Sequence, residues 1–268
     1  MTHAVGDRAP LGTLLRDWRR RRRLSQLDLA LEAGVSARHL SFVETGRSRP
    51  SREMVLHLAE QLDVPLRDRN QLLLAAGFAP AYGERALDAP ELRPVRDAIG
   101  LVLEGHEPYP AVVVDRWWNL VAANRPIALF TEGAAPALLE PPVNVLRLAL
   151  HPEGAASRIL NLAEFRAHLL DRLRRHVALT ADERLMALQA EIEGYPAAGG
   201  DESAAAGSDI VAPLRLRTPD RGAELRFFST IATFGTAVDV TVAELAIEAF
   251  FPADAATAEA LRELAGVR

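Results

Sequence analysis

The chain has 268 residues, which is long enough for two domains of ordinary size. Its 49% hydrophobic and 25% charged residues are typical of globular proteins, and no apolar run approaches the length of a membrane-spanning helix. The absence of cysteine excludes disulfides, thiolate metal sites and cysteine nucleophiles. The N-terminus also lacks the apolar segment of a secretion signal, so we expect a cytoplasmic protein without membrane association.

The net charge of −5 is distributed unevenly along the chain. Residues 1–78 contain 13 arginines and 9 acidic residues, whereas the remainder contains 18 arginines and 27 acidic residues. Lysine is absent throughout, which we attribute to codon bias in a GC-rich genome. A basic first part and an acidic second part predict one domain that binds a polyanion such as DNA and one that does not.

The basic part, residues 8–78, carries five short segments with helical periodicity. We expect helices over residues 11–22, 25–33, 37–45, 52–62 and 66–76. In the second of these, Leu27, Ala30 and Leu31 are expected to be buried. Gly34 and Gly46 stand where the second and third helices end. Two short helices joined by a glycine-containing turn indicate a helix-turn-helix in an all-α, five-helix domain.

The motifs in this part are Ser25-Gln26, Ala33-Gly34-Val35-Ser36, Leu40-Ser41, Glu44-Thr45-Gly46 and Arg49-Pro50-Ser51. Their combined spacing resembles the lambda-repressor-like (XRE) family. The resemblance implies that the third helix enters the major groove of double-stranded DNA with its N-terminal residues at base edges. The residues expected at the DNA are Gln26, Ser36, Ala37, Arg38, His39, Ser41, Phe42, Arg47, Arg49 and Arg52.

These residues have different expected roles at the DNA. Arg38 is the best base reader, because a guanidinium binds guanine O6 and N7 bidentately. Gln26 is expected to contact phosphate and to help order Arg38, and the arginines that follow the third helix are expected to contact the backbone. Glu44 is expected to brace the turn. The arginine run 19–23 is equally consistent with a solvated face and with phosphate contact.

Residues 79–91 are rich in Ala, Pro and Gly and predict a linker, which leaves residues 92–268 as the second domain. There we expect helices at 92–103, 123–130, 159–177, 181–194 and 255–264, and strands at 111–114, 118–122, 211–217, 224–234 and 238–251. Residues 197–207 are expected to form a loop. This order predicts an α+β domain with a five-stranded antiparallel sheet packed by helices on one face, which is the layout of a PAS-like sensor domain.

Several motifs of the second domain resemble those of the MmyB-like transcription regulators. They are Tyr109-Pro110-Ala111, Trp117-Trp118-Asn119, Ala123-Asn124, Asn144-Val145-Leu146-Arg147, Leu150-His151-Pro152-Glu153-Gly154, Phe234-Gly235 and Asp239-Val240-Thr241. The resemblance implies a ligand-responsive regulator that acts as a homodimer. Its PAS-like domain is expected to bind a small apolar molecule, with fatty-acid-like ligands as the leading class.

A ligand cavity between the last three strands and the helix near residues 162–173 would be lined by large apolar side chains and a few polar groups. The candidates are Val113, Trp117, Trp118, Asn124, Leu146, Arg147, Phe165, Phe228 and Phe234. Arg147 is expected to pair either with a ligand carboxylate or with a protein acid such as Glu244 or Glu248. Phe234 is expected to gate the cavity. If both tryptophans lie in a strand, they point to opposite faces.

Two other function classes compete with a ligand-responsive regulator. An enzyme is not favoured, because the sequence contains no glycine-rich phosphate loop, no G-x-S-x-G elbow and no zinc motif, and we expect no catalytic residues, metal or cofactor. A repressor whose second domain only dimerises, with its cavity filled by side chains, remains the alternative. Mass spectrometry of organic extracts of the purified protein would distinguish it from a ligand sensor.

Overall fold

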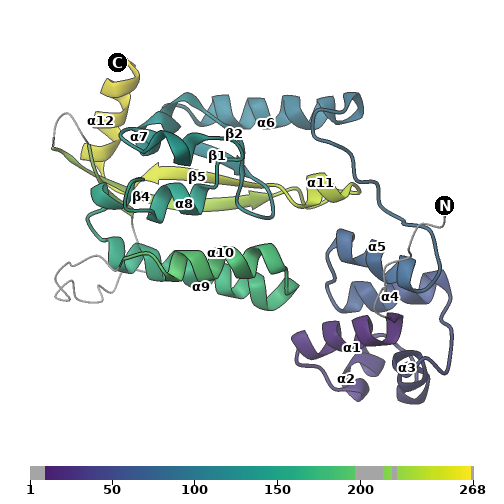
Figure 1. Cartoon of the computed structure of the whole chain (residues 1–268). Coiled ribbons are helices and arrows are strands. Elements are labelled where there is room, and N and C mark those ends of the chain that lie inside the picture. The colour runs from purple at the N-terminus through teal and green to yellow at the C-terminus, as the bar shows by residue number, and fades with distance from the viewer. Residues whose placement is uncertain (1–9, 197–213, 219–221, 267–268) are drawn as a thin grey trace, which may run out of the picture. The chain divides into compact units, whose positions relative to one another are not determined.

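The computed structural model describes residues 10–196, 214–218 and 222–266 (Figure 1). They divide into two compact units. The first unit comprises Met1–Arg85 together with Thr236–Ala243, and the second comprises Ala86–Gly235 together with Glu244–Arg268. The loop expected at residues 197–207 lies outside the described residues.

Five helices build the N-terminal part of the first unit, as the sequence predicts. They are α1 (Leu11–Arg21), α2 (Gln26–Glu32), α3 (Ala37–Glu44), α4 (Arg52–Gln61) and α5 (Leu66–Ala75). The serine that precedes each of α2, α3 and α4 accepts a hydrogen bond from the backbone N–H three residues later, which satisfies a free donor of the first turn. Gly34 and Gly46 follow α2 and α3 with φ of 62° and 73°, a conformation that glycine adopts without steric cost.

The core of the first unit is closely packed around leucines from several helices. Leu15, Leu40 and Leu72 are fully buried there. In α2 the buried residues are Leu29 and Ala30. The expectation that Leu27 and Leu31 are buried is wrong, because they are 60% and 72% exposed on the opposite side of this seven-residue helix.

The first unit also contains the chain that follows α5 and a short segment from late in the sequence. The side-chain amide of Asn70 donates a hydrogen bond to the carbonyl of Tyr82 and accepts hydrogen bonds from the backbone N–H groups of Ala81 and Tyr82. Further along, Arg85 pairs with Asp239 at 2.9 Å, just before helix α11 (Val240–Ala243). The strand expected over residues 238–251 is therefore shorter than predicted, because its first part is helical.

The second unit is an α+β domain built on a five-stranded antiparallel sheet of order β2-β1-β5-β4-β3. Its strands are β1 (Ala111–Val114), β2 (Leu120–Ala123), β3 (Leu214–Arg217), β4 (Glu224–Thr233) and β5 (Ala246–Pro252). Its α-helices are α6 (Arg93–His106), α7 (Ala128–Thr131), α8 (Val145–Leu150), α9 (Leu162–Thr180), α10 (Glu183–Glu193) and α12 (Ala255–Ala265). Short 3-10 turns lie at Pro90–Leu92, Arg125–Ile127, Pro136–Leu139 and Ala156–Arg158.

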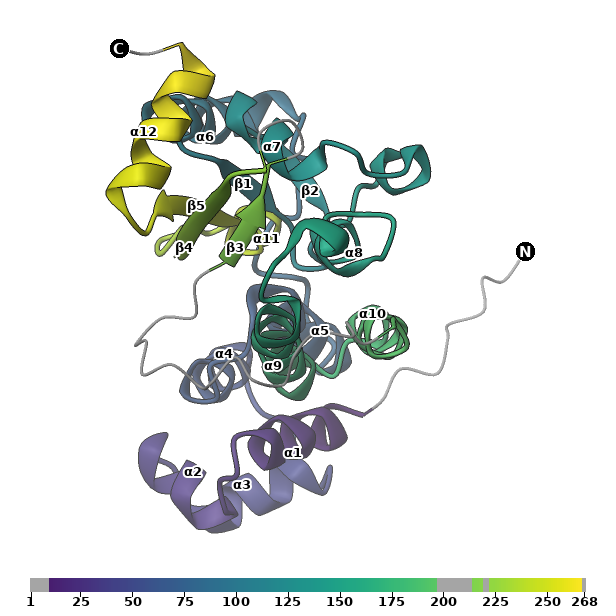
Figure 2. The ribbon, with the colours of Figure 1, turned by 90° about the vertical axis from the view of Figure 1, so that its left-hand side faces the viewer.

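Helices cover both faces of the sheet rather than the one face that the sequence predicts. Ile99 and Leu103 of α6 pack with Val113 and Ile247 on one face. Helices α8 and α9 lie on the other side of the sheet, with α10 beside α9 (Figure 1). Helix α12 lies by β4 and β5, with Leu261 in the cluster of Leu225 and Phe227 (Figure 2). Helix α8 was not predicted, because its six residues are too few to show a helical period.

Candidate functional site

The helix-turn-helix of the first unit exposes the N-terminal half of α3. Ser36 caps this helix by accepting from His39 N at 3.1 Å, while Leu40 and Val43 are buried beneath it. Arg38 is exposed, and its guanidinium carbon lies 5.4 Å from the ring centre of the half-buried Phe42. Ala37, His39 and Ser41 are likewise half-buried. This surface can therefore present a guanidinium and an aromatic ring to the edges of bases.

A buried carboxylate at the end of α3 connects this helix to α1 and α2. Glu44, at the end of α3, is 3% exposed and accepts from Arg19 Nε at 2.7 Å and from Arg19 Nη2 at 2.9 Å. Gln26 Nε2 donates to the same carboxylate at 2.8 Å. Burial raises the pKa of Glu44, but the hydrogen bonds from Arg19 and Gln26 outweigh it and hold the pKa below its ordinary value. The contacts therefore agree with the expected bracing role of Glu44.

One sequence expectation changes with this network. Arg19 is 8% exposed and neither faces solvent nor is available to phosphate. Gln26 donates to Glu44, so its amide ties the start of α2 to the end of α3. The three arginines that follow α3, at positions 47, 49 and 52, are exposed and form no ion pair with a described residue. That arrangement leaves them available to a polyanion.

Close approach of two helices also shapes this part of the unit. A Cβ atom at Gly12 of α1 would overlap the carbonyl oxygen of Glu44. Glycine at this position therefore allows α1 to lie against the end of α3. Arg16, one turn along α1, donates to the same carbonyl at 2.9 Å.

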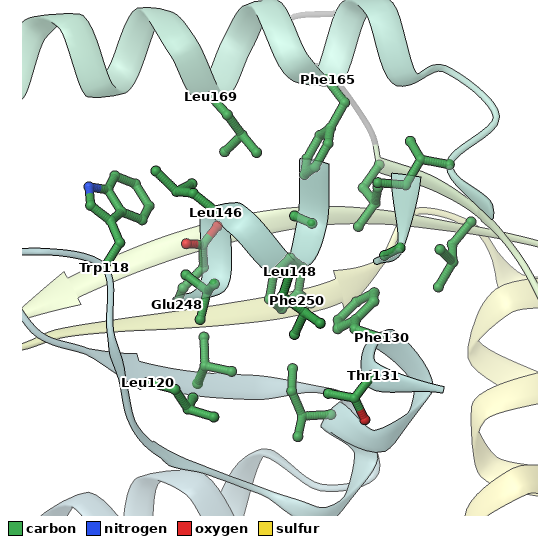
Figure 3. A pocket seen from close by; sticks show the side chains of 18 residues that line it. Trp118, Leu120, Phe130, Thr131, Leu146, Leu148, Phe165, Leu169, Glu248 and Phe250 are labelled. Carbon is green, nitrogen blue, oxygen red and sulfur yellow. The ribbon is translucent and has the colours of Figure 1, made fainter. Parts of the chain in front are cut away.

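The second unit contains a cavity of about 80 Å³ between the inner face of the sheet and helices α7, α8 and α9 (Figure 3). Eighteen residues line it: Val112, Trp118, Leu120, Ile127, Phe130, Thr131, Val145, Leu146, Leu148, Ala149, Ala155, Ile159, Phe165, Leu169, Leu214, Leu216, Glu248 and Phe250. Protein interiors rarely leave such space between side chains. Nearly all of the lining is aliphatic or aromatic, which suits an apolar ligand.

Three of the nine residues predicted for the cavity line it. Trp118, Leu146 and Phe165 come from the β1–β2 turn, α8 and α9 respectively. One other predicted residue lies on the opposite face of the sheet. Val113 packs with α6 there, because strand side chains alternate and its neighbour Val112 takes the inward position.

Two of the predicted phenylalanines also lie outside the cavity. Phe228 stacks on Phe251 with ring centres 5.3 Å apart, one position away from the buried Phe227. Phe234 packs against the cluster that contains Ile99 and Val113, and it is not among the residues that line the cavity that it was expected to gate.

The predicted polar residues hold the protein together instead of lining the cavity. Asn124 accepts from Ala111 N at 2.9 Å and donates to the carbonyls of Leu103 and Tyr109. Arg147 pairs with Glu191 at 2.7 Å, so its partner is a protein acid, although neither of the two named in the sequence analysis.

The two tryptophans lie in the turn between β1 and β2, not in a strand. Asp115 Oδ1 accepts from Trp117 N and from Asn119 N, which fixes the turn, and Trp118 has a φ of 66°. A left-handed conformation is costly for a bulky residue, and such strain is found where the surroundings require one side-chain direction. Here it places the Trp118 ring in the cavity wall, while the Trp117 indole donates to Asp182 at 3.2 Å.

Most of the cavity wall escaped sequence reasoning. Leu148, Leu169 and Phe250 come from elements whose inward side the sequence does not specify. Glu248 gave the clearest signal, because it is an acid within an otherwise apolar strand. Glu248 was expected as one candidate partner of Arg147, whereas its actual partner is Arg172 at 3.1 Å.

The described part of the chain contains no group of three or more His, Cys, Asp or Glu residues positioned to hold a metal ion. None of its helices combines the length and the apolar character needed to cross a membrane.

Comparison with known proteins supports this division into two parts. Residues 15–68 match the family model of a helix-turn-helix, and residues 95–264 match the model described as MmyB-like transcription regulator ligand binding domain. A similar protein is the uncharacterized HTH-type transcriptional regulator RghRB of Bacillus subtilis (strain 168), 36% identical over 84 residues. That match covers 31% of this chain and 58% of the relative. Because the ligand-binding model spans more than half of the chain, the protein belongs to the MmyB-like transcription regulator family.

Proposed function

We propose that this protein is a DNA-binding transcription regulator whose second unit binds a small apolar, fatty-acid-like ligand. The observation that carries the proposal is the cavity of about 80 Å³, whose wall is almost wholly apolar, in a chain that also has a helix-turn-helix. The exposed side of α3 and the unpaired arginines after it supply the DNA surface.

The competing function is a repressor whose second unit serves only for dimerisation. That hypothesis expects the space between sheet and helices to be filled by side chains. The cavity favours a ligand instead, because close packing is the rule in interiors and an open apolar space lowers stability unless something occupies it.

The ligand can be tested on the full-length protein without knowing its identity. We expect mass spectrometry of organic extracts to detect an aliphatic compound, and aliphatic ligands to raise the melting temperature. The shift follows from mass action, with about 2.7 kcal/mol of stabilisation at a hundredfold excess over the dissociation constant. No shift across a series of short, medium and long chains, together with empty extracts, would favour the dimerisation-only hypothesis.

The DNA-binding activity is tested by selection from a random duplex library with the full-length protein. We propose that the protein acts as a homodimer, so the selected sequences should contain two half-sites about 34 Å apart. A fragment of residues 1–85 should bind the same half-site at least about a hundredfold more weakly, because it loses the avidity of the dimer. Equal affinity of fragment and full chain would place the dimer interface in the first unit.

A further inference from the structure

Glu248 is the only charged residue among the described residues that line the cavity. It lies on β5 at an inward position, opposite Val112 of β1, and is 8% exposed. Figure 3 shows its carboxylate beside Leu146, on the side of the cavity where Trp118 lies. A buried acid in an apolar wall has a large desolvation cost, so it needs a partner for each oxygen.

The protein supplies a partner for one oxygen only. Arg172 Nη1 donates to Glu248 Oε2 at 3.1 Å, and the Arg172 guanidinium lies 4.2 Å from the ring centre of Trp118. No described residue donates a hydrogen bond to Glu248 Oε1. Arg172 is not part of the cavity wall, so a ligand in the cavity meets the acid and not the base.

Two polar groups therefore bear on the head group at this end: the Glu248 carboxylate, and the Trp118 Nε1–H, a buried donor without a hydrogen-bond partner that a hydroxyl oxygen could fill. A hydroxyl or ammonium group would donate to Oε1, and hydrogen bonds to an ionised acceptor are stronger than neutral ones. A ligand carboxylate would instead bring a second negative charge beside Glu248, in surroundings where water screens little. No lining residue within the described part offers a cation to offset that repulsion.

We infer that the cavity selects an aliphatic ligand with a hydrogen-bond-donating head group, an alcohol or an amine, and discriminates against a carboxylate anion. Glu248 is the specificity-determining residue. This inference rests on the proposed ligand-binding function and refines it, because it keeps the aliphatic chain and replaces the acid head.

The inference is tested by calorimetric titration of the full-length protein at mildly alkaline pH with four probes that share an unbranched eight-carbon chain. Octan-1-ol and octylamine carry a donor, methyl octanoate carries none, and octanoate carries a negative charge. We expect the alcohol and the amine to bind at least about tenfold more tightly than octanoate. The ester should bind more weakly than the alcohol. This comparison needs no variant and therefore does not depend on the folding of one.

A matched pair of variants assigns the selectivity to one side chain. Glu248→Gln keeps an acceptor oxygen but removes the charge, so the preference for alcohol over octanoate should fall about tenfold and the preference for amine should disappear. Glu191→Gln also removes an ion-paired acid, the partner of Arg147, but outside the cavity wall, and should leave the ranking unchanged.

The outcomes separate the two proposals. Octanoate binding as tightly as octan-1-ol, or an unchanged ranking in Glu248→Gln, would overturn the head-group inference and leave the ligand-binding function standing. No binding of any probe, nor of shorter and longer chains, would overturn both.

Discussion

The two units each contain a buried glutamate at a structurally central position, and the two differ in how fully they are satisfied. Both oxygens of Glu44 in the first unit accept hydrogen bonds, from Arg19 and Gln26, and its side chain is wholly buried. Glu248 in the second unit has one oxygen bonded to Arg172 and the other beside a cavity. Glu44 therefore stabilises the packing of α1, α2 and α3, whereas Glu248 retains one carboxylate oxygen that can accept a hydrogen bond from a ligand.

The cores differ in the same way. The buried residues of α1 to α5 form a single hydrophobic cluster, with a fully buried leucine from each helix. The second unit distributes its buried residues over three clusters, with Leu146 and Leu169 in one and Phe130 and Leu216 in another. Residues of both clusters line the cavity, so the cavity lies between these two clusters.

The largest expected effect is the loss of Glu44. Glu44→Ala leaves Arg19 buried without its partner, so the first unit should lose about 3–5 kcal/mol of stability. Thermal unfolding of the full-length protein, followed by circular dichroism, should show loss of helical signal at a lower temperature than in the unsubstituted protein. Glu224→Ala is a control, because Glu224 pairs with Arg215 and Arg226 near the surface and such pairs contribute about 0–1 kcal/mol.

Acid should weaken the first unit through the same residue. The pKa of Glu44 is lower in the folded than in the unfolded protein, so its contribution is present above the unfolded pKa and is lost as the pH falls towards and through the folded pKa. In Glu44→Gln this part of the pH dependence should disappear. An identical acid profile in both proteins would contradict the assigned role.

A second comparison makes the same substitution in both cores. Leu73 in α5 is fully buried in the core cluster of the first unit, so Leu73→Phe should cost about 1–3 kcal/mol through overpacking. Leu169→Phe adds the same volume beside the cavity and should cost less than about 1 kcal/mol while lowering ligand affinity about tenfold. Equal destabilisation by the two variants would show that the second core is as tightly packed as the first.

The DNA surface offers a third contrast, between two exposed arginines of the first unit. Arg38→Ala should cost about 1–3 kcal/mol on the specific site and relax discrimination at one base pair. Arg47→Ala should weaken binding to all DNA sequences similarly. It should also reduce the slope of the logarithm of affinity against the logarithm of salt concentration by about one. Fluorescence anisotropy on specific and random duplexes at several salt concentrations measures both effects. The same profile for the two variants would remove Arg38 from the base-reading role.

The smallest effect is expected at Phe234. Because Phe234 packs against the cluster that contains Ile99 and Val113, and not in the cavity wall, Phe234→Trp should leave ligand affinity unchanged. Phe165→Trp enlarges a ring that lies in the wall and should weaken binding. Calorimetric titration with the preferred ligand compares them. Loss of ligand affinity in Phe234→Trp would instead support the sequence prediction that Phe234 gates the cavity.

Local sequence signals predict the N-terminal five-helix part of the first unit well. Serine caps, glycine ends and apolar periodicity are local signals, and each lies within one helix and its flanking turn. They predict the five helices, the turn between α2 and α3 and the exposed position of Arg38. Even there, the partner of Glu44 was not predictable, because Arg19 lies on another helix, 25 residues away in sequence.

Tertiary structure alone decided the site of the second unit. Which of Val112 and Val113 points inward depends on the register of β1 beside β5, and a one-residue difference exchanges the two faces. The inward direction of Trp118 depends on a left-handed turn that composition does not reveal. The cavity itself is the space that sheet, α8 and α9 leave between them, and Glu248 becomes its one charged lining group, among the residues described, only because β5 turns that position toward it. Such features depend on how distant segments meet, so local sequence carries little information about them.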